Sequence, residues 1–436
     1  MKNFLIALLL FLTNFNLIAQ IQNGPMIGYV QEKEVALWVQ TTKNEDVQFA
    51  LRLVGEKKWT YTQVYKTKEA DAFVCQQVVE KLKPAKKYEY RVVINGHLES
   101  PIGPQIIETQ ASLKIKQKAV DFAFAVGSCA YINEEGFDRP GKPYGGDYQI
   151  FDAVYQSSPK FVMWLGDNIY FRNADLTTRS AMTHRYSYSR ALPELQKLLA
   201  NIPQYAIWDD HDFGPNDSDG NFEKKTTTKE LFELFWANPA ANNSNLQGIT
   251  TQFEWSDCQF FLLDNRYERS AISQDAGVKT ILGPTQLDWL KSELLQSKAT
   301  FKFVAIGGQF LNTAPVFENY AANGFDKERQ EIIDFIYQYQ IKNVVFLTGD
   351  RHHSELSVLN EMGKPIIYDL TVSPLTSGVH DALNEANALR VDGSHIAQRN
   401  FGVLKVEGAF KARVLSIEIK DATGTTIWET KINQAL

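Results

Sequence analysis

The feature that most constrains this chain is a set of apolar runs, each followed at once by side chains that bind metals. The four pieces are Val126-Gly-Ser-Cys129, Leu165-Gly-Asp-Asn-Ile-Tyr170, Trp208-Asp-Asp-His-Asp212 and Leu347-Thr-Gly-Asp-Arg-His352. Amphipathic stretches lie between the apolar runs, and this alternation is typical of stacked β-α units. Because ligands of such sheets bind beyond the carboxyl ends of the strands, we expect the four pieces to meet at one edge.

The segment from residue 114 to 436 therefore reads as one α/β domain. Buried strands are expected at 122–126, 161–165, 205–208, 301–306 and 344–347, and helices at 192–199, 229–236, 284–295 and 328–339. The helix at 284–295 begins with proline, which suits the first turn of a helix. Strand-like alternation returns at 401–406, 412–419 and 426–428, which predicts a second sheet stacked on the first.

Residues 20–113 have a different pattern. Short runs rich in β-branched and aromatic residues occur at 35–41, 47–54, 59–65, 73–79 and 88–94. Several short strands at this spacing predict a β-sandwich, and no residue there suggests catalysis. The linker to the α/β domain is expected within 109–118.

The first nineteen residues are interpreted as a signal peptide. Lys2 precedes an apolar run at 4–12, and Ala19 stands at a boundary with polar residues. This order predicts export, to the periplasm or the medium, and the run is short for a membrane span. An N-terminal core helix is the simpler alternative. No later apolar run is long enough to cross a membrane.

The charge of the chain argues against nucleic acid as a partner. The formal net charge is −6, and lysine and arginine are scattered without a basic stripe, so wrapping of nucleic acid is disfavoured. The three cysteines, Cys75, Cys129 and Cys258, are an odd number. At least one thiol is therefore free or bonded to something other than sulfur.

Each polar piece alone has a simpler explanation. A cysteine after a strand is more often a small buried hydrophobe, and Gly-Asp is often a turn or a helix cap. Residues 209–212 taken alone fit a solvated loop. The four pieces together, in this order, favour a metal site. The three acids within residues 209–212 repel one another unless a cation offsets their charge.

The order Gly-Asp-x-x-ligand, Asp-His-acid and Gly-x-x-His resembles the calcineurin-like metallophosphoesterase superfamily. The cysteine in the first piece and the tyrosine in the second resemble its PhoD-like alkaline phosphatase family, over about residues 121–432. Two further pieces carry the resemblance, Leu263-Asp-Asn-Arg266 and Leu282-Gly-Pro-Thr-Gln-Leu-Asp-Trp-Leu290. A fibronectin type III or immunoglobulin-like sandwich in front also resembles that family.

The resemblance implies a four-layer α/β/β/α catalytic domain holding iron(III) and calcium, other divalent cations remaining possible. Asp167 would bridge two metal sites. The iron ligands would be Cys129, Tyr170 and His352, and the calcium ligands would be Asp210, Asp350 and Asn216. Thiolate and phenolate suit iron, whereas carboxylate and amide oxygens suit calcium.

The implied activity is hydrolysis of phosphate mono- or diesters by a metal-bound hydroxide, since cations lower the pKa of bound water. His211 would stabilise the transition state or protonate the leaving oxygen. Arg351 and Arg172 would clamp the phosphate, although either arginine fits a structural ion pair equally well. The alternatives are a narrow-specificity phosphodiesterase or phospholipase D-like enzyme acting on a phospholipid or nucleotide, and a non-catalytic binding protein. Every metal-type position is filled, which favours catalysis.

Overall fold

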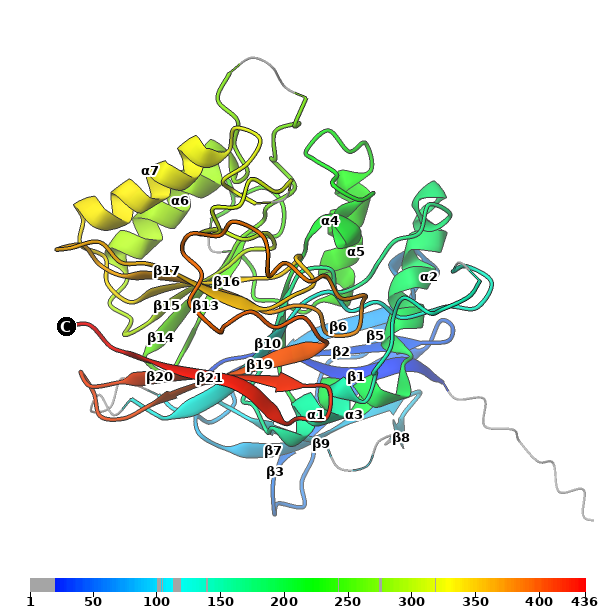
Figure 1. The fold of residues 1–436 in the computed structure, drawn as a ribbon. Coiled ribbons are helices and arrows are strands. Elements are labelled where there is room, and N and C mark those ends of the chain that lie inside the picture. Colours follow the sequence, from blue (N-terminus) through cyan, green and yellow to red (C-terminus); the bar gives the residue numbers. More distant parts are fainter. Residues whose placement is uncertain are drawn as a thin grey trace, which may run out of the picture.

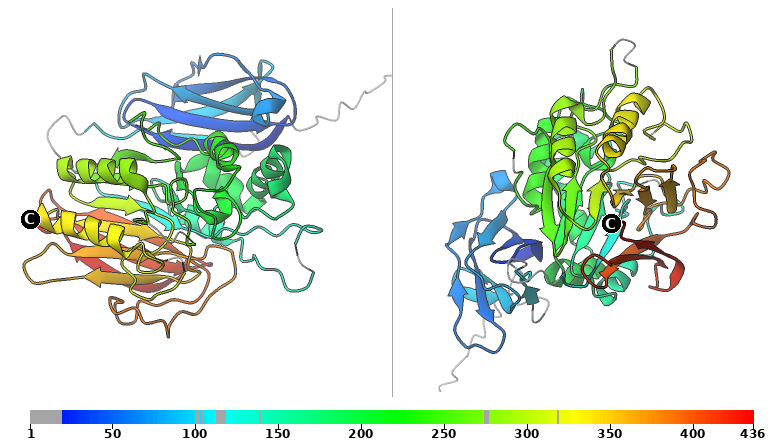
Figure 2. Two further views of the ribbon diagram at one scale, coloured as in Figure 1. Left: turned by 90° about the horizontal axis from the view of Figure 1, so that it is seen from above. Right: turned by 90° about the vertical axis from the view of Figure 1, so that its left-hand side faces the viewer.

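A computed structural model describes residues 20–99, 103, 105–112, 119–138, 140–241, 243–273, 277–317 and 319–436. The predicted signal peptide at 1–19 and part of the predicted linker, 113–118, lie outside the described residues. Figures 1 and 2 show a small all-β part packed against a larger α/β part. None of the helices in the described ranges has the length and apolar character needed to cross a membrane.

The N-terminal part is a β-sandwich, as predicted. One sheet has the order β1 (Ile21–Val30), β2 (Val35–Thr41), β6 (Val74–Val79). The other has the order β4 (Thr60–Tyr61), β3 (Asp46–Leu53), β7 (Lys87–Ile94), β8 (His97–Glu99), with β5 (Tyr65–Lys66) paired to β3 and β9 (Gln105–Glu108) to β7. Trp38, Phe49 and Tyr90 are fully buried and form its core.

The first sheet of the α/β part has the order β12 (Gln204–Ile207), β11 (Val162–Leu165), β10 (Phe122–Gly127), β19 (Asn400–Glu407), β20 (Val414–Asp421), β21 (Thr426–Asn433). Strands β10, β11 and β12 are parallel to one another, whereas β19 is antiparallel to β10. The C-terminal strands therefore complete the sheet that begins at residue 122.

The second sheet has the order β13 (Thr251–Trp255), β14 (Cys258–Leu262), β15 (Lys302–Ala305), β16 (Val344–Thr348), β18 (Ile367–Thr371), β17 (Glu355–Leu359). Strands β14, β15, β16 and β18 are parallel. An aromatic core that includes Phe124, Phe260 and Phe303 joins the two sheets, with ring centroids 4.8–5.3 Å apart. Aromatic rings bury large apolar areas, so this core holds the sheets face to face.

Helices cover the outer faces. Helices α6 (Gly283–Gln296) and α7 (Asp326–Gln338) bury Leu290, Leu294 and Ile336 against the second sheet. Helices α1 (Ile150–Gln156) and α3 (Pro193–Asn201) lie at the first sheet (Figure 1). The predicted α/β/β/α architecture is confirmed.

The remaining helices, α2 (Arg179–Arg190), α4 (Asp210–Phe213) and α5 (Lys225–Phe235), lie beside the sheets.

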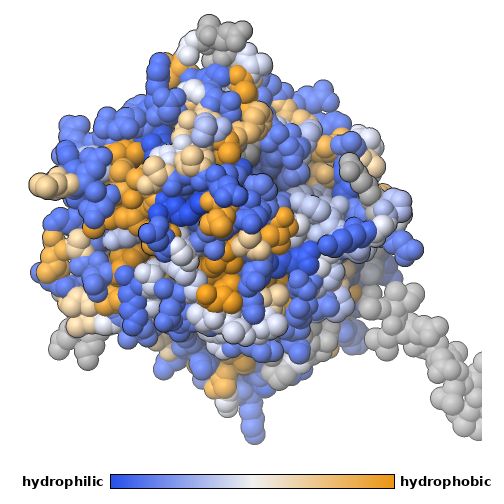
Figure 3. Space-filling model, viewed as in Figure 1, coloured by the Kyte–Doolittle hydropathy of each residue, from blue (hydrophilic) through white to orange (hydrophobic). Residues whose placement is uncertain are grey.

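The sandwich packs directly on the α/β part. The Tyr90 hydroxyl donates to the Ala200 carbonyl at 2.7 Å, and the Trp38 indole donates to the Leu234 carbonyl at 2.8 Å. A Cβ added at Gly28 would lie 2.4 Å from the Cβ of Ala237, so the backbones approach closely there. Hydrophilic and hydrophobic residues are interspersed over the face seen in Figure 3. All three cysteines are buried and free.

Candidate metal centre

The four polar pieces meet at the edge of the two sheets where the parallel strands end. Cys129 follows β10, Asp167 follows β11, and Asp210 opens α4 after β12. These three come from the first sheet, and Asp350 follows β16 of the second. The central cluster, as it is called below, consists of Cys129, Asp167, Tyr170, Asp210, Asp350 and His352.

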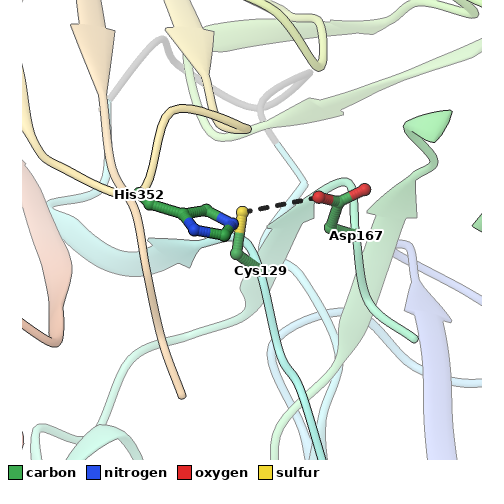
Figure 4. Close-up of side chains that lie close together, drawn as sticks. All are labelled: Cys129, Asp167 and His352. Carbon is green, nitrogen blue, oxygen red and sulfur yellow. Dashed lines mark hydrogen bonds between the residues drawn. The ribbon is translucent and has the colours of Figure 1, made fainter. Parts of the chain in front are cut away.

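One group in the central cluster is formed by Cys129, Asp167 and His352, whose ligand atoms all lie within 4.8 Å of one another. The Cys129 sulfur is 3.6 Å from Oδ2 of Asp167, and the His352 ring points at the same place (Figure 4). The Tyr170 hydroxyl lies 3.1 Å from Nε2 of His352. A thiol, a carboxylate, an imidazole and a phenol thus converge from three loops.

Two further groups adjoin the first. Asp167, Asp210 and His211 have ligand atoms within 4.8 Å of one another, as do Asp209, Asp210 and Asp350. Asp167 belongs to two of these groups. Asp210 also belongs to two, so both carboxylates lie where a ligand shared by two cations could sit, and Asp167 is the one that joins the group containing Cys129 and His352.

The backbone at the central cluster is strained. Cys129, Asp167, Asp350 and His352 have φ angles of 60°, 52°, 65° and 56°, in the left-handed region that side chains other than glycine rarely adopt. Such conformations persist where the surrounding structure imposes them, and they gather at functional sites. These strained residues carry four of the six side chains of the central cluster.

The charges in the cluster are unfavourable for the protein alone. Burial, followed by the charges of Asp210, Asp209 and Asp350, raises the pKa of Asp167 well above its ordinary value. Burial also raises the pKa of the Cys129 thiol well above its usual range. A bound cation reverses both effects, because it favours the anionic forms of its ligands. The donor set therefore fits a cationic metal.

Two members of the cluster have lowered pKa values. Burial lowers the pKa of His352 to about 4, so its ring is neutral and able to coordinate a metal at neutral pH. Burial works against ionisation of Asp210, but the charges of His211 and Arg266 outweigh it and lower the pKa of this carboxyl.

Several supporting residues were given no role from the sequence. The Asn265 amide donates to Oδ1 of Asp209 at 2.7 Å, and the Arg266 guanidinium binds the same carboxylate. Both belong to the Leu263-Asp-Asn-Arg266 piece, which was the one available signal. The Tyr144 hydroxyl lies 3.1 Å from Nδ1 of His352. It comes from a loop without regular structure, and no pattern marked it.

Asn216, a predicted calcium ligand, is exposed in the turn after α4, where its amide donates to Oδ2 of Asp217 at 2.6 Å. The neighbouring Asp217 amide donates to Oδ2 of Asp210 at 2.7 Å, so this turn folds back onto the centre. Its role as a ligand stays a prediction.

The predicted phosphate-binding arginines differ in their surroundings. The Arg172 guanidinium is bound to both Asp138 oxygens and to the carbonyls of Ile132 and Tyr170. This is the structural ion pair that the sequence left open, and it holds the Tyr170 loop. Arg351 binds Glu385 through Nη2, and its buried Nε has no hydrogen-bond partner among the described residues. It therefore retains donors for a ligand.

His211, the predicted acid, follows Asp210 at the start of α4. Its ring centroid lies 4.2 Å from that of Tyr170, and its backbone amide donates to Oδ1 of Asp167 at 3.3 Å. The side chain is partly exposed, unlike its buried neighbours, so it stands between the cluster and solvent.

Two stacked sheets flanked by helices, with these donors at their common edge, define a metallophosphoesterase fold. A solved structure titled "Structure of PhoD" has a TM-score of 0.75 over 96% of this chain and 93% of its own, at 17% identity. Purple acid phosphatase PPD1 from yellow lupin (Lupinus luteus) has a TM-score of 0.69 at 10% identity, over 94% of this chain and 74% of its own.

The sequence narrows this class to one family. The model of the PhoD-like phosphatase family matches residues 124–416, so the chain belongs to this family. A domain of unknown function, DUF7800, matches residues 18–109. Alkaline phosphatase D of Bacillus subtilis (strain 168) is 25% identical over 315 residues, 64% of this chain. The chain spans 53% of that relative's length.

Proposed function

We propose that this chain is an exported, metal-dependent phosphoesterase that hydrolyses phosphate monoesters, diesters or both. The observation that carries the proposal is the convergence of Cys129, Asp167 and His352 within 4.8 Å, with Asp210 and Asp350 in adjoining groups. Family membership and the printed name of the Bacillus relative, an alkaline phosphatase, support the same activity.

The donors divide by chemistry. Cys129, Tyr170 and His352 form the set suited to iron(III), because thiolate and phenolate are strongly donating anions. Asp210 and Asp350 are proposed to hold calcium, which prefers oxygen ligands, and Asn216 remains a candidate for this role. Asp167 is proposed as the shared ligand, because it belongs both to the group of Cys129 and His352 and to the group of Asp210.

When bound, the cations supply an activated water and neutralise charge on the phosphoryl oxygens. The protein's own residues then orient the ester. His211, on the open side of the cluster, is proposed to donate a proton to the leaving oxygen. Arg351 is proposed to bind a phosphoryl oxygen through the donors that Glu385 does not use.

The test is an activity screen with metal content measured in parallel. p-Nitrophenyl phosphate, bis(p-nitrophenyl) phosphate and phosphatidylcholine represent monoester, diester and phospholipid substrates. Turnover of any of them that depends on bound metal supports the proposal, and the preferred substrate sets its specificity. A chain that binds iron and calcium but turns over none of them contradicts a broad phosphoesterase activity, and nucleotide substrates then separate a narrow-specificity enzyme from a binding protein on this fold.

Export is tested separately. We propose that residues 1–19 are removed on secretion. N-terminal sequencing of protein recovered from the periplasm or medium is expected to begin near Gln20. A chain that stays in the cytoplasm with Met1 intact contradicts this part of the proposal without touching the chemistry.

A further inference from the structure

A second group of metal-binding side chains lies outside the central cluster. His353, Glu355 and His395 have ligand atoms within 4.8 Å of one another, and we call them the side cluster. His353 and Glu355 are fully buried at the start of β17, and the His395 side chain is 8% exposed. We propose that the side cluster binds one divalent transition-metal ion of the zinc type, which clamps the segment 378–400 to the metal centre.

The hydrogen bonds of the two histidines leave one nitrogen of each available. Nδ1 of His353 lies 2.9 Å from the Arg351 carbonyl, and Nε2 of His395 lies 2.9 Å from an oxygen of Asp381. A carbonyl and a carboxylate only accept, so both of these ring nitrogens carry the hydrogen. Metal-binding histidines are held in this way, with the outer N–H donated to a carbonyl or carboxylate.

The two ring nitrogens that remain are both buried. Nε2 of His353 and Nδ1 of His395 have no hydrogen-bond partner within the part of the chain that the structure describes. Buried polar atoms nearly always have partners, so two such atoms in one small group require an explanation. In a neutral imidazole each of them presents a lone pair, which is the form that binds a metal.

The third donor is held in place by its neighbours. Oε1 of Glu355 accepts from the amides of Gln309, Asn312 and Asn387 at 2.8–2.9 Å. Oε2 accepts from Arg390 and lies 3.8 Å from Nε2 of His353. That separation is too long for a hydrogen bond, but two metal bonds of about 2.0–2.2 Å each can span it.

The ligand types indicate which ion fits. Two imidazole nitrogens and one carboxylate oxygen form the set that zinc uses at sites that keep a fourth position for water. Calcium is disfavoured, because it takes six to eight oxygen ligands. Arg390 already offsets the charge of Glu355, so the two imidazole nitrogens would supply most of the binding.

An ion in the side cluster would connect two parts of the chain. His353 directly follows His352 of the central cluster, whereas His395 belongs to the segment 378–400. Backbone hydrogen bonds between Ser354 and Ile396 already join these parts next to the side cluster. The ion would thus fix the turn that carries Arg351 and His352, which makes His395 a positioning residue.

The decisive experiment locates zinc directly. Crystals of the iron- and calcium-loaded protein are soaked in zinc chloride, and anomalous differences are measured on both sides of the zinc absorption edge. We expect a zinc peak within about 2.0–2.1 Å of Nε2 of His353 and Nδ1 of His395. Absence of a peak at this position, in crystals where the side cluster is ordered, overturns the proposal whatever the activity of the protein.

Variants provide an independent test in solution. His395→Ala is expected to retain one zinc ion fewer per chain than the wild type, with unchanged iron content. His380→Ala is the matched control, because His380 is 56% exposed on the same segment and binds Glu385 instead. Equal zinc retention in wild type and His395→Ala contradicts the proposal. The crystal measurement on the wild type decides even if the variant fails to fold.

Discussion

The Tyr170 hydroxyl lies 3.1 Å from Nε2 of His352, although 182 residues separate the two in the chain. Tyr170 follows β11 of the first sheet, and His352 follows β16 of the second. The contact therefore spans the junction between the sheets. It follows that the central cluster exists only once both sheets have packed on their aromatic core.

Removing this hydroxyl tests the proposed iron site. Tyr170→Phe is expected to abolish the visible phenolate-to-iron band of the iron-loaded protein, because no phenolate then binds the metal. Absorption spectra at equal iron content measure this. Tyr144→Phe is the control, since Tyr144 contacts the other ring nitrogen of His352 at 3.1 Å. A band that survives Tyr170→Phe and vanishes in Tyr144→Phe would mean that the ligand is Tyr144.

The second prediction concerns Asp167, the carboxylate proposed to be shared by two metals. Asp167→Asn is expected to lose iron and calcium together and to lower kcat/KM by at least about 1,000-fold, because the proposed bridging ligand becomes neutral. Metal analysis and single-substrate kinetics on the same sample test both effects. Asp147→Asn alters an exposed ion pair with Arg399 and should leave metal content unchanged. Full activity in Asp167→Asn would place the bridge elsewhere.

Substitution of Arg351 is expected to lower activity, whereas substitution of Arg172 is expected to lower stability. Arg351→Lys should lower kcat/KM by about 10- to 100-fold, the value of one charged hydrogen bond, with little change in melting temperature. Arg172→Lys should instead lower stability by about 1–3 kcal/mol, because it breaks a two-pronged ion pair and its stacking on Tyr131. Kinetics and thermal unfolding of both variants separate the roles. The reverse pattern would make Arg172 the clamp.

Asp369 predicts a pH dependence of stability. Burial raises the pKa of this carboxyl to about 6, although it accepts hydrogen bonds from Phe310, Leu311 and Thr348. The folded chain then binds the proton more tightly than the unfolded chain. This contribution to stability is complete below about pH 4 and is lost as pH rises through 6, by about 3 kcal/mol in all.

Asp369→Asn should therefore flatten the stability profile between pH 4 and 7 relative to the wild type. Melting temperatures across this range are the measurement. Asp334→Asn, on the exposed face of α7, should leave the profile unchanged. Parallel profiles for Asp369→Asn and the wild type would show that folding does not change the pKa of this carboxyl.

The strongly apolar elements could be predicted from the sequence. The strand predicted at 35–41 coincides with β2, and the predicted helix at 284–295 differs from α6 by one residue at each end. Helix α2 and the β13–β14 hairpin were not predicted. The α2 sequence is dominated by serine, tyrosine and arginine, so its apolar periodicity is weak, and tertiary packing determines that it is helical.

Some residues of the site could likewise be predicted from the sequence, and others could not. The residues that directly follow parallel strands could be placed together from the sequence, because topology brings strand ends to one edge. Tyr144 and Asn265 could not, since their positions depend on the conformation of a long loop and on which strands become neighbours. The side cluster was missed for the same reason. His395 comes from an irregular segment whose path no periodicity describes.

The packing of the sandwich on the α/β part limits how the chain can be divided. The Tyr205 hydroxyl on β12 accepts a hydrogen bond from the Val30 amide at the end of β1. Strand β1 of the sandwich therefore supports β12, the strand that leads to Asp210. Removing the sandwich by a cut after residue 113 would remove this hydrogen bond and expose the surface around Ala237, which packs against Gly28, to water. Fusions or truncations that keep the α/β part alone are therefore expected to aggregate.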